Sequence, residues 1–121
     1  MARILIAEDV ADIAQVLRIG LEREGFTVVI AHDGNTALSR ALDGDIDLAI
    51  LDIRMPGLDG MAVLREVRAI PTLQQYPIIM LTANITQEEM ADGFAAGADA
   101  YIIKPFRISA VATKIRELLA T

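Results

Sequence analysis

The chain has 121 residues, 54% of them hydrophobic and only 4% aromatic, which excludes a disordered chain and fits one domain with an aliphatic core. The absence of cysteine excludes disulfide frameworks, thiolate metal sites and cysteine catalysis. A net charge of −6 argues against direct nucleic-acid binding, and no apolar run is long enough for a signal peptide or a membrane span, so we expect a cytoplasmic protein.

Five apolar runs rich in Ile, Leu and Val predict the strands of a sheet. Each run is continuous rather than alternating, as expected for strands that are covered on both faces. The runs are Ile4–Ala7, Thr27–Ala31, Leu48–Leu51, Ile78–Leu81 and Tyr101–Ile103.

The first two segments between these runs have the three- and four-residue spacing of helices, and a glycine follows each as a stop signal, Gly25 and then Gly44. The side chains predicted to face the core are Ile13, Val16, Leu17 and Leu21 in the first helix and Ala37, Leu38, Ala41 and Leu42 in the second.

Three further helices are predicted by similar spacing. The third follows Asp59-Gly60 and ends before Pro71. The fourth opens with a capping box made by Thr86 and Glu89, and Gly93 lowers its helix propensity. The fifth carries its apolar face on Val111, Ile115, Leu118 and Leu119.

Strict alternation of strand and helix predicts an α/β fold, a doubly wound five-stranded parallel sheet with five helices on its two faces. Right-handed crossovers favour the flavodoxin-like strand order 2-1-3-4-5. Ligands of such sheets bind beyond the carboxyl ends of the strands. The side chains at those ends are Glu8, Asp9, Asp52, Thr82, Ala83, Asn84, Lys104 and Pro105, while His32 follows a strand at the edge of the sheet.

Three carboxylates at one edge of a sheet repel one another unless a cation lies between them. Oxygen ligands with room for water and phosphate suit Mg²⁺. A carboxylate also serves as a covalent acceptor in phosphoryl transfer, in which cations, hydroxyls and amides stabilise the transferring group. The set therefore predicts Mg²⁺-dependent phosphoryl transfer to a carboxylate.

The chain resembles the response-regulator receiver domain of two-component signalling (the CheY-like family) over essentially its whole length, so residues 1–121 are expected to form one receiver domain. The matching segments are Ile4–Asp9, Leu51–Gly60, Leu81–Ala83, Gly97–Tyr101 and Lys104–Phe106. The resemblance implies that Asp52 is the phosphoacceptor. It further implies that Mg²⁺ is bound by Asp9, Asp52 and the backbone carbonyl of Arg54, with Glu8 acting through a water.

The same resemblance assigns roles around the phosphoryl group. Thr82, Ala83 and Lys104 would bind its oxygens, with Thr82 and Lys104 taking part in catalysis. Thr82 and Tyr101 would form the switch, in which Tyr101 swings inward when Thr82 moves. The Lys104–Pro105 peptide bond is expected to be cis.

The resemblance also implies partners. A histidine kinase or a histidine phosphotransfer protein would supply the phosphoryl group, and a downstream protein or output domain would contact the face made by the fourth helix, fifth strand and fifth helix. The chain would be a monomer or a weak phosphorylation-dependent dimer. We expect this output face to include Ala91, Ala95, Ala98, Asp99, Tyr101, Lys114 and Arg116.

Two positions are expected to tune hydrolysis of the aspartyl phosphate. Arg54 and Asn84 lie two residues beyond Asp52 and Thr82, so each should flank the path of the attacking water. We expect Arg54, on a flexible loop, to occupy that path and to slow self-hydrolysis.

Three other interpretations compete with this one. An Asp-nucleophile phosphatase would place a second Asp where Arg54 stands, and a flavodoxin-type cofactor binder would have a phosphate loop after the first strand. A degenerate receiver would act as an unphosphorylated binding module, and Mg²⁺ binding and phosphorylation distinguish it from an active one. The sequence leaves open whether the chain is a single-domain regulator or part of a longer protein.

Overall fold

Five parallel strands form the centre of the computed structural model, which describes residues 2–120. Their order, β2-β1-β3-β4-β5, confirms the predicted topology, and every neighbouring pair is parallel. The strands extend one residue beyond four of the predicted runs, and the extensions of β3 and β4 place Asp52 and Thr82 inside the sheet. The strands are β1 (Arg3–Ala7), β2 (Thr27–Ala31), β3 (Leu48–Asp52), β4 (Ile78–Thr82) and β5 (Ala100–Ile103).

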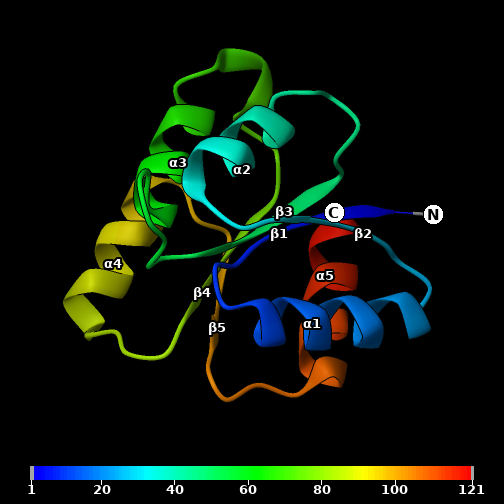
Figure 1. Ribbon diagram of the computed structural model, residues 1–121. Helices are drawn as coiled ribbons and strands as arrows, with labels where there is room; N and C mark the ends of the chain where they lie inside the picture. Colours follow the sequence, from blue (N-terminus) through cyan, green and yellow to red (C-terminus); the bar gives the residue numbers. More distant parts are fainter. Residues whose placement is uncertain (1, 121) are drawn as a thin grey trace.

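The helices lie on both faces of this sheet, α1 and α5 on one and α2, α3 and α4 on the other (Figure 1). They are α1 (Ala11–Arg23), α2 (Gly34–Ala41), α3 (Gly60–Arg68), α4 (Gln87–Ala96) and α5 (Ile108–Leu119), with a short 3-10 helix at Pro71–Leu73. The capping box predicted for α4 is present: the Thr86 hydroxyl accepts from the Glu89 amide at 3.1 Å, and the Glu89 carboxylate accepts from the Thr86 amide at 3.2 Å.

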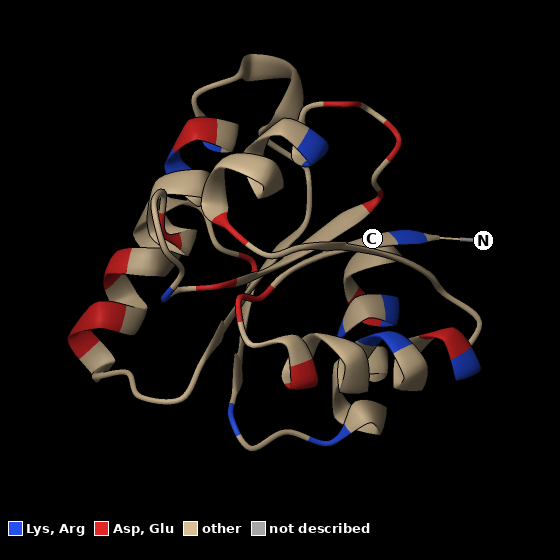
Figure 2. Ribbon diagram, in the orientation of Figure 1, with Lys and Arg blue, Asp and Glu red and all other residues tan. Residues whose placement is uncertain are grey.

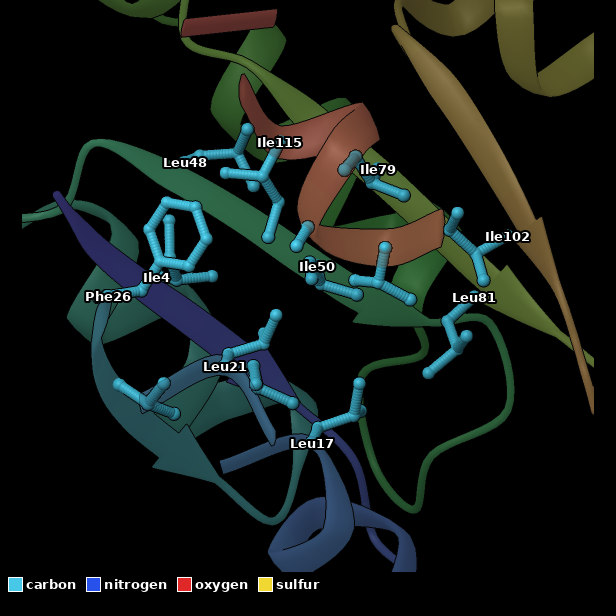
Figure 3. Close-up of a cluster of buried hydrophobic side chains, with 14 of the residues drawn as sticks. Ile4, Leu17, Leu21, Phe26, Leu48, Ile50, Ile79, Leu81, Ile102 and Ile115 are labelled. Carbon is cyan, nitrogen blue, oxygen red and sulfur yellow. The ribbon is translucent and has the colours of Figure 1, made fainter. Parts of the chain in front are cut away.

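The core has two parts because successive strand residues point to opposite faces of the sheet. Ile4 and Ile6 of β1 pack beneath α1 and α5, in the cluster drawn in Figure 3, whereas Leu5 and Ala7 pack beneath the helices of the other face. Both faces are therefore covered, as the continuous apolar runs predict.

Two predicted core positions are wrong. Val16 is 55% exposed, because α1 packs on the sheet through Ala14, Leu17 and Leu21. Leu42 is 45% exposed, because it is the C-cap of α2 and lies beyond its last full turn. Among the described residues, none of the helices combines the length and the hydrophobicity that a membrane span requires.

Candidate functional site

The strand ends bring the predicted site residues together at one edge of the sheet. Glu8 and Asp9 follow β1, Asp52 ends β3, Thr82 ends β4 and Lys104 follows β5. Carboxylate oxygens of the three acidic residues lie within 4.8 Å of one another. A pocket of about 200 Å³ opens above them, lined by Asp9, Val10, Asp52, Arg54, Thr82, Ala83, Asn84 and Lys104. Figure 2 shows the acidic segments that meet where β1 and β3 end.

The Lys104 ammonium group forms ion pairs with both buried carboxylates, those of Asp52 and Glu8. Its Nζ lies 2.7 Å from Oδ2 of Asp52 and 2.8 Å from Oε1 of Glu8. Its backbone amide donates to the Thr82 carbonyl at 2.8 Å, which continues the β4–β5 ladder to the pocket. Burial lowers the pKa of Lys104, but the hydrogen bonds and charges of Asp52 and Glu8 outweigh this effect and raise it. The ammonium group is therefore held in its charged form.

Glu8 is a fully buried carboxylate. Besides the ion pair with Lys104, its Oε2 accepts a hydrogen bond from the Val10 amide at 3.1 Å, at the start of α1. The pKa of Glu8 is raised to about 7, chiefly by burial and also by the neighbouring Asp52, while the contact with Lys104 opposes both effects. A cation bound beside Glu8 would favour its charged form.

Both carboxylate oxygens of Asp52 have a donor. Oδ1 accepts from the Arg54 amide at 2.8 Å, and Oδ2 accepts from Lys104. The loop after Asp52 is also constrained, because the Gly60 amide donates to the Ile53 carbonyl at 3.0 Å. The carboxylate is thus oriented toward the pocket by its own loop and by β5.

The loop between β3 and α3 differs from the sequence expectation. Met55 is buried, and the Arg54 amide is bonded to Asp52, so the backbone at Arg54 is held rather than flexible. The Arg54 side chain itself is exposed at the rim of the pocket. The predicted position beside the pocket is correct, and the expected flexibility of the loop is wrong.

Thr82 and Asn84 also line the pocket, from the end of β4 and the loop after it. The Thr82 hydroxyl donates to the Asn84 carbonyl at 3.1 Å, and its side chain is buried. Ala83 and Asn84 are exposed at the rim. The Thr82 hydroxyl therefore donates to its own loop while the residue lines the pocket.

The remaining predicted residues lie around this centre. The Lys104–Pro105 peptide bond is cis, as expected. Tyr101 pairs with Met80 on β4, two residues before Thr82, and is not among the pocket residues. His32 lies apart at the sheet edge, where its Nδ1 is 3.3 Å from the Glu8 carbonyl.

Two residues expected on the output face lie elsewhere. Ala98 is buried against the sheet, because the Schellman-like end of α4 turns it inward. Arg116 points toward α1: its guanidinium lies 2.9 Å from the Glu24 carboxylate and 5.3 Å from the centre of the Phe26 ring. Ala91, Ala95 and Asp99 form exposed parts of the predicted face.

Sequence reasoning missed a contact network behind this face. The Arg68 guanidinium donates to the carbonyls of Gly97 and Leu73 and to the Asp99 carboxylate, each at 2.9 Å. Asp99 also accepts from the Ile78 amide at 2.8 Å. Asp99 is thus engaged within the domain and is not a free acidic group on the surface.

The donor set fits Mg²⁺. The close carboxylates are hard oxygen ligands, and the Arg54 carbonyl lies on the same loop as Asp52. Lys104 contacts only Glu8 and Asp52 among these acids, so Asp9 keeps an exposed carboxylate beside the pocket that has no ion pair within residues 2–120. Negative charge therefore remains for an ion to neutralise.

Sequence comparison relates residues 4–116 to the response regulator receiver domain. The transcriptional regulatory protein ResD of Bacillus subtilis (strain 168) is 40% identical over 117 residues, which are 97% of this chain and 48% of that protein. The chain thus spans about half the length of the curated relatives it matches.

Solved structures show the same similarity. Chemotaxis protein CheY4 of Vibrio cholerae superposes with a TM-score of 0.91 at 30% identity, covering 98% of each chain. The receiver domain of sensor histidine kinase PA1611 from Pseudomonas aeruginosa PAO1 superposes with a TM-score of 0.90 at 31% identity, covering 99% of this chain and 98% of that one. The latter was solved with a magnesium ion coordinated in its active site cleft.

Proposed function

Since the chain belongs to the response regulator receiver domain family, we propose that Asp52 accepts a phosphoryl group from a phosphohistidine of a histidine kinase or a phosphotransfer protein. Receiver domains of response regulators are signalling switches rather than metabolic enzymes. The observation that carries the proposal is the position of Lys104, whose Nζ joins the buried carboxylates of Asp52 and Glu8 at 2.7 and 2.8 Å. This arrangement provides a carboxylate nucleophile next to a fixed positive charge.

The proposed step forms one bond and breaks one bond. An oxygen of the Asp52 carboxylate attacks phosphorus, the phosphorus–nitrogen bond breaks, and the imidazole of the donor leaves with the electron pair and takes up a proton. Lys104 orients the carboxylate before attack and then pairs with a phosphoryl oxygen. The Thr82 hydroxyl and the amide of Ala83 donate to the other oxygens, which spreads the charge over several donors.

Mg²⁺ would be held by Asp9, Asp52 and the Arg54 carbonyl, with Glu8 acting through a water, and when bound it supplies charge neutralisation to the phosphoryl oxygens. The chain's own part is to hold these oxygens close together. The short bond from the Arg54 amide to Asp52 Oδ1 fixes the loop that carries the carbonyl ligand.

A donor protein would reach Asp52 across an apolar surface next to the pocket. A second pocket, of about 510 Å³, shares Ala83 and Lys104 with the first; its other lining residues are Asp12 and the mostly apolar Ile13, Val16, Pro105 and Phe106. The exposure of Val16, unexpected for a core residue, is accounted for if a partner covers it. Transfer of the signal onward would use α4, β5 and α5.

Phosphorylation by acetyl phosphate with Mg²⁺ tests the chemistry directly. Intact-protein mass measurement should show one phosphoryl addition, which hydroxylamine removes because an acyl phosphate is a mixed anhydride. The addition should disappear in Asp52→Asn and persist in Asp43→Asn, which changes an exposed carboxylate at the end of α2.

The competing function is a degenerate receiver that binds partners without phosphorylation. It predicts no mass addition in the parent protein and equal partner binding with and without the small donor. A mass addition that survives in Asp52→Asn would instead place the acceptor on another residue and contradict the proposal.

A further inference from the structure

The hydroxyl of Tyr101 rests in a notch on α4 that exists because residue 93 is glycine. A Cβ built on Gly93 would overlap the Tyr101 hydroxyl oxygen and would lie 2.8 Å from Cζ of the ring. Phe94 closes the side of the notch, with its ring at 73° to that of Tyr101 and the two centroids 5.1 Å apart. Any residue larger than glycine at position 93 would compete with Tyr101 for the same space.

The notch holds Tyr101 by shape rather than by a hydrogen bond. The hydroxyl is buried and has no hydrogen-bond partner among residues 2–120. Burial, together with the negative charges of Asp92 and Glu89, raises the pKa of this phenol. A buried hydroxyl without a partner loses its contacts with water and gains none in return, so leaving the notch costs Tyr101 little.

When the Tyr101 side chain lies in the notch, it cannot also lie beside Thr82. Tyr101 pairs with Met80 and lies one pleat before the Thr82–Ile103 pair, on the same face of the sheet. One side chain cannot occupy the notch under α4 and also fill space beside Thr82. The Thr82 hydroxyl meanwhile donates to the Asn84 carbonyl of its own loop at 3.1 Å.

We propose that Gly93 is a positioning residue that creates the resting site of the Tyr101 side chain, and that it thereby sets how often the unphosphorylated chain adopts the activated arrangement. This inference rests on the proposed function and on the switch that the family resemblance implies, in which Tyr101 swings inward when Thr82 moves. Loss of the notch removes the resting site while leaving Asp52, Lys104 and the acidic residues unchanged. Because the predicted overlap involves the far end of a side chain, a swing of Tyr101 relieves it without a change in the backbone.

The direct test is the position of the ring, observed by fluorine NMR. The chain has two tyrosines, so Tyr76→Phe leaves 3-fluorotyrosine at position 101 alone. In this background, Gly93→Ala should move the resonance of the unphosphorylated protein at least halfway toward that of the parent loaded with Mg²⁺ and beryllium fluoride, a mimic of the phosphoryl group. Phosphorylation by acetyl phosphate should become at least threefold faster.

Gly20→Ala is a matched control, because a Cβ on Gly20 of α1 would collide with the Ile108 side chain, far from Tyr101. This control should leave the resonance in place. The unfolding free energy provides a second measurement: Gly93→Ala should be more destabilising with Tyr101 present than in a Tyr101→Phe background, where the overlapping hydroxyl is gone.

The outcomes separate the two proposals. The role of Gly93 is overturned if the resonance in Gly93→Ala does not move or moves away from the activated position, or if phosphorylation becomes slower. The position of the resonance decides this whether or not the parent protein accepts a phosphoryl group. If Gly93→Ala does not fold, removal of the overlapping hydroxyl by Tyr101→Phe should restore folding, and failure to fold in both backgrounds overturns the role of Gly93 as well. Failure of the parent to accept a phosphoryl group would contradict the proposed function, and the resonance would then still decide whether Gly93 positions Tyr101.

Discussion

The backbone carbonyl of Leu58 packs directly on the α-carbon of Gly34, so that the loop after β3 rests on the first turn of α2. A Cβ on Gly34 would overlap the Leu58 carbonyl oxygen and would lie 2.8 Å from the Leu58 Cβ. At the end of the same loop, a Cβ on Gly60 would overlap the Asp52 carbonyl oxygen. Two glycines therefore let the loop that carries Arg54 approach its neighbours closely and hold its shape.

Gly34→Ala should slow phosphorylation of Asp52, although Gly34 does not line the pocket. The overlap is with backbone atoms, which cannot swing aside, so the loop must shift, at a cost of about 1–3 kcal/mol in unfolding free energy. We expect phosphorylation by acetyl phosphate to slow by about tenfold, since a misplacement of about 1 Å is enough for such a loss. Ser39→Ala, at an exposed position of α2, is the control. Normal phosphorylation in Gly34→Ala would show that the loop does not depend on this contact.

The fold and the composition of the site were predictable because both follow from periodic patterns. Continuous apolar runs alternating with helical segments determine a parallel sheet, and a parallel sheet places the residues after β1, β3, β4 and β5 at one edge. Glu8, Asp52 and Lys104 could therefore be grouped from the sequence alone. Their pairing could not, because it depends on which side chain reaches which across the pocket.

The glycine contacts were missed for a related reason. Gly34 and Gly93 meet residues of other elements, Leu58 of the loop after β3 and Tyr101 of β5, and no local pattern records such an approach. The low helix propensity of Gly93 indicated only a weaker helix. The available signal was a glycine within a helix where alanine would be more stable, which points to a neighbour that needs the space.

Asp9→Ala should strongly weaken Mg²⁺ binding. Asp9 is the exposed member of the three carboxylates, and hard-ion affinity depends on the number and charge of the oxygen ligands. We expect at least a tenfold loss of affinity by calorimetric titration of the parent and the variant, and a comparable loss for Asp52→Ala. Asp12→Ala, in the first turn of α1, should bind as the parent does. Unaltered affinity in Asp9→Ala would exclude this residue as a ligand.

Glu8→Gln should change how stability depends on pH. The folded-state pKa of Glu8 is raised from 4.5 to about 7, chiefly by burial. The neutral acid is thus favoured on folding, and its contribution is complete below pH 4.5 and is lost as the pH rises to about 7. With Mg²⁺ removed by a chelator, the parent should lose roughly 1–3 kcal/mol of unfolding free energy relative to Glu8→Gln over this range. Parallel pH profiles from urea unfolding would contradict the assignment.

Arg54→Ala should shorten the lifetime of the phosphorylated state. The Arg54 amide is bonded to Asp52 Oδ1 at 2.8 Å, but its exposed side chain has no hydrogen bond or ion pair to another described residue. The guanidinium is therefore free to contact phosphoryl oxygens and to cover the approach of water. Such a contact in the ground state does not accelerate hydrolysis, because only interactions that strengthen in the transition state do so.

We expect hydrolysis in Arg54→Ala to be at least threefold faster, about 0.7 kcal/mol lower in barrier, when phosphate release is followed after removal of the donor at saturating Mg²⁺. Asn84→Ala, also at the rim of the pocket, is the comparison: its uncharged amide orients water weakly, so its effect should be smaller. The backbone bond from residue 54 to Asp52 survives in the alanine variant, which confines the change to the side chain. Slower hydrolysis in Arg54→Ala would mean that the guanidinium stabilises the transferring group, as arginine does at other phosphoryl-transfer sites, and that it does not block water.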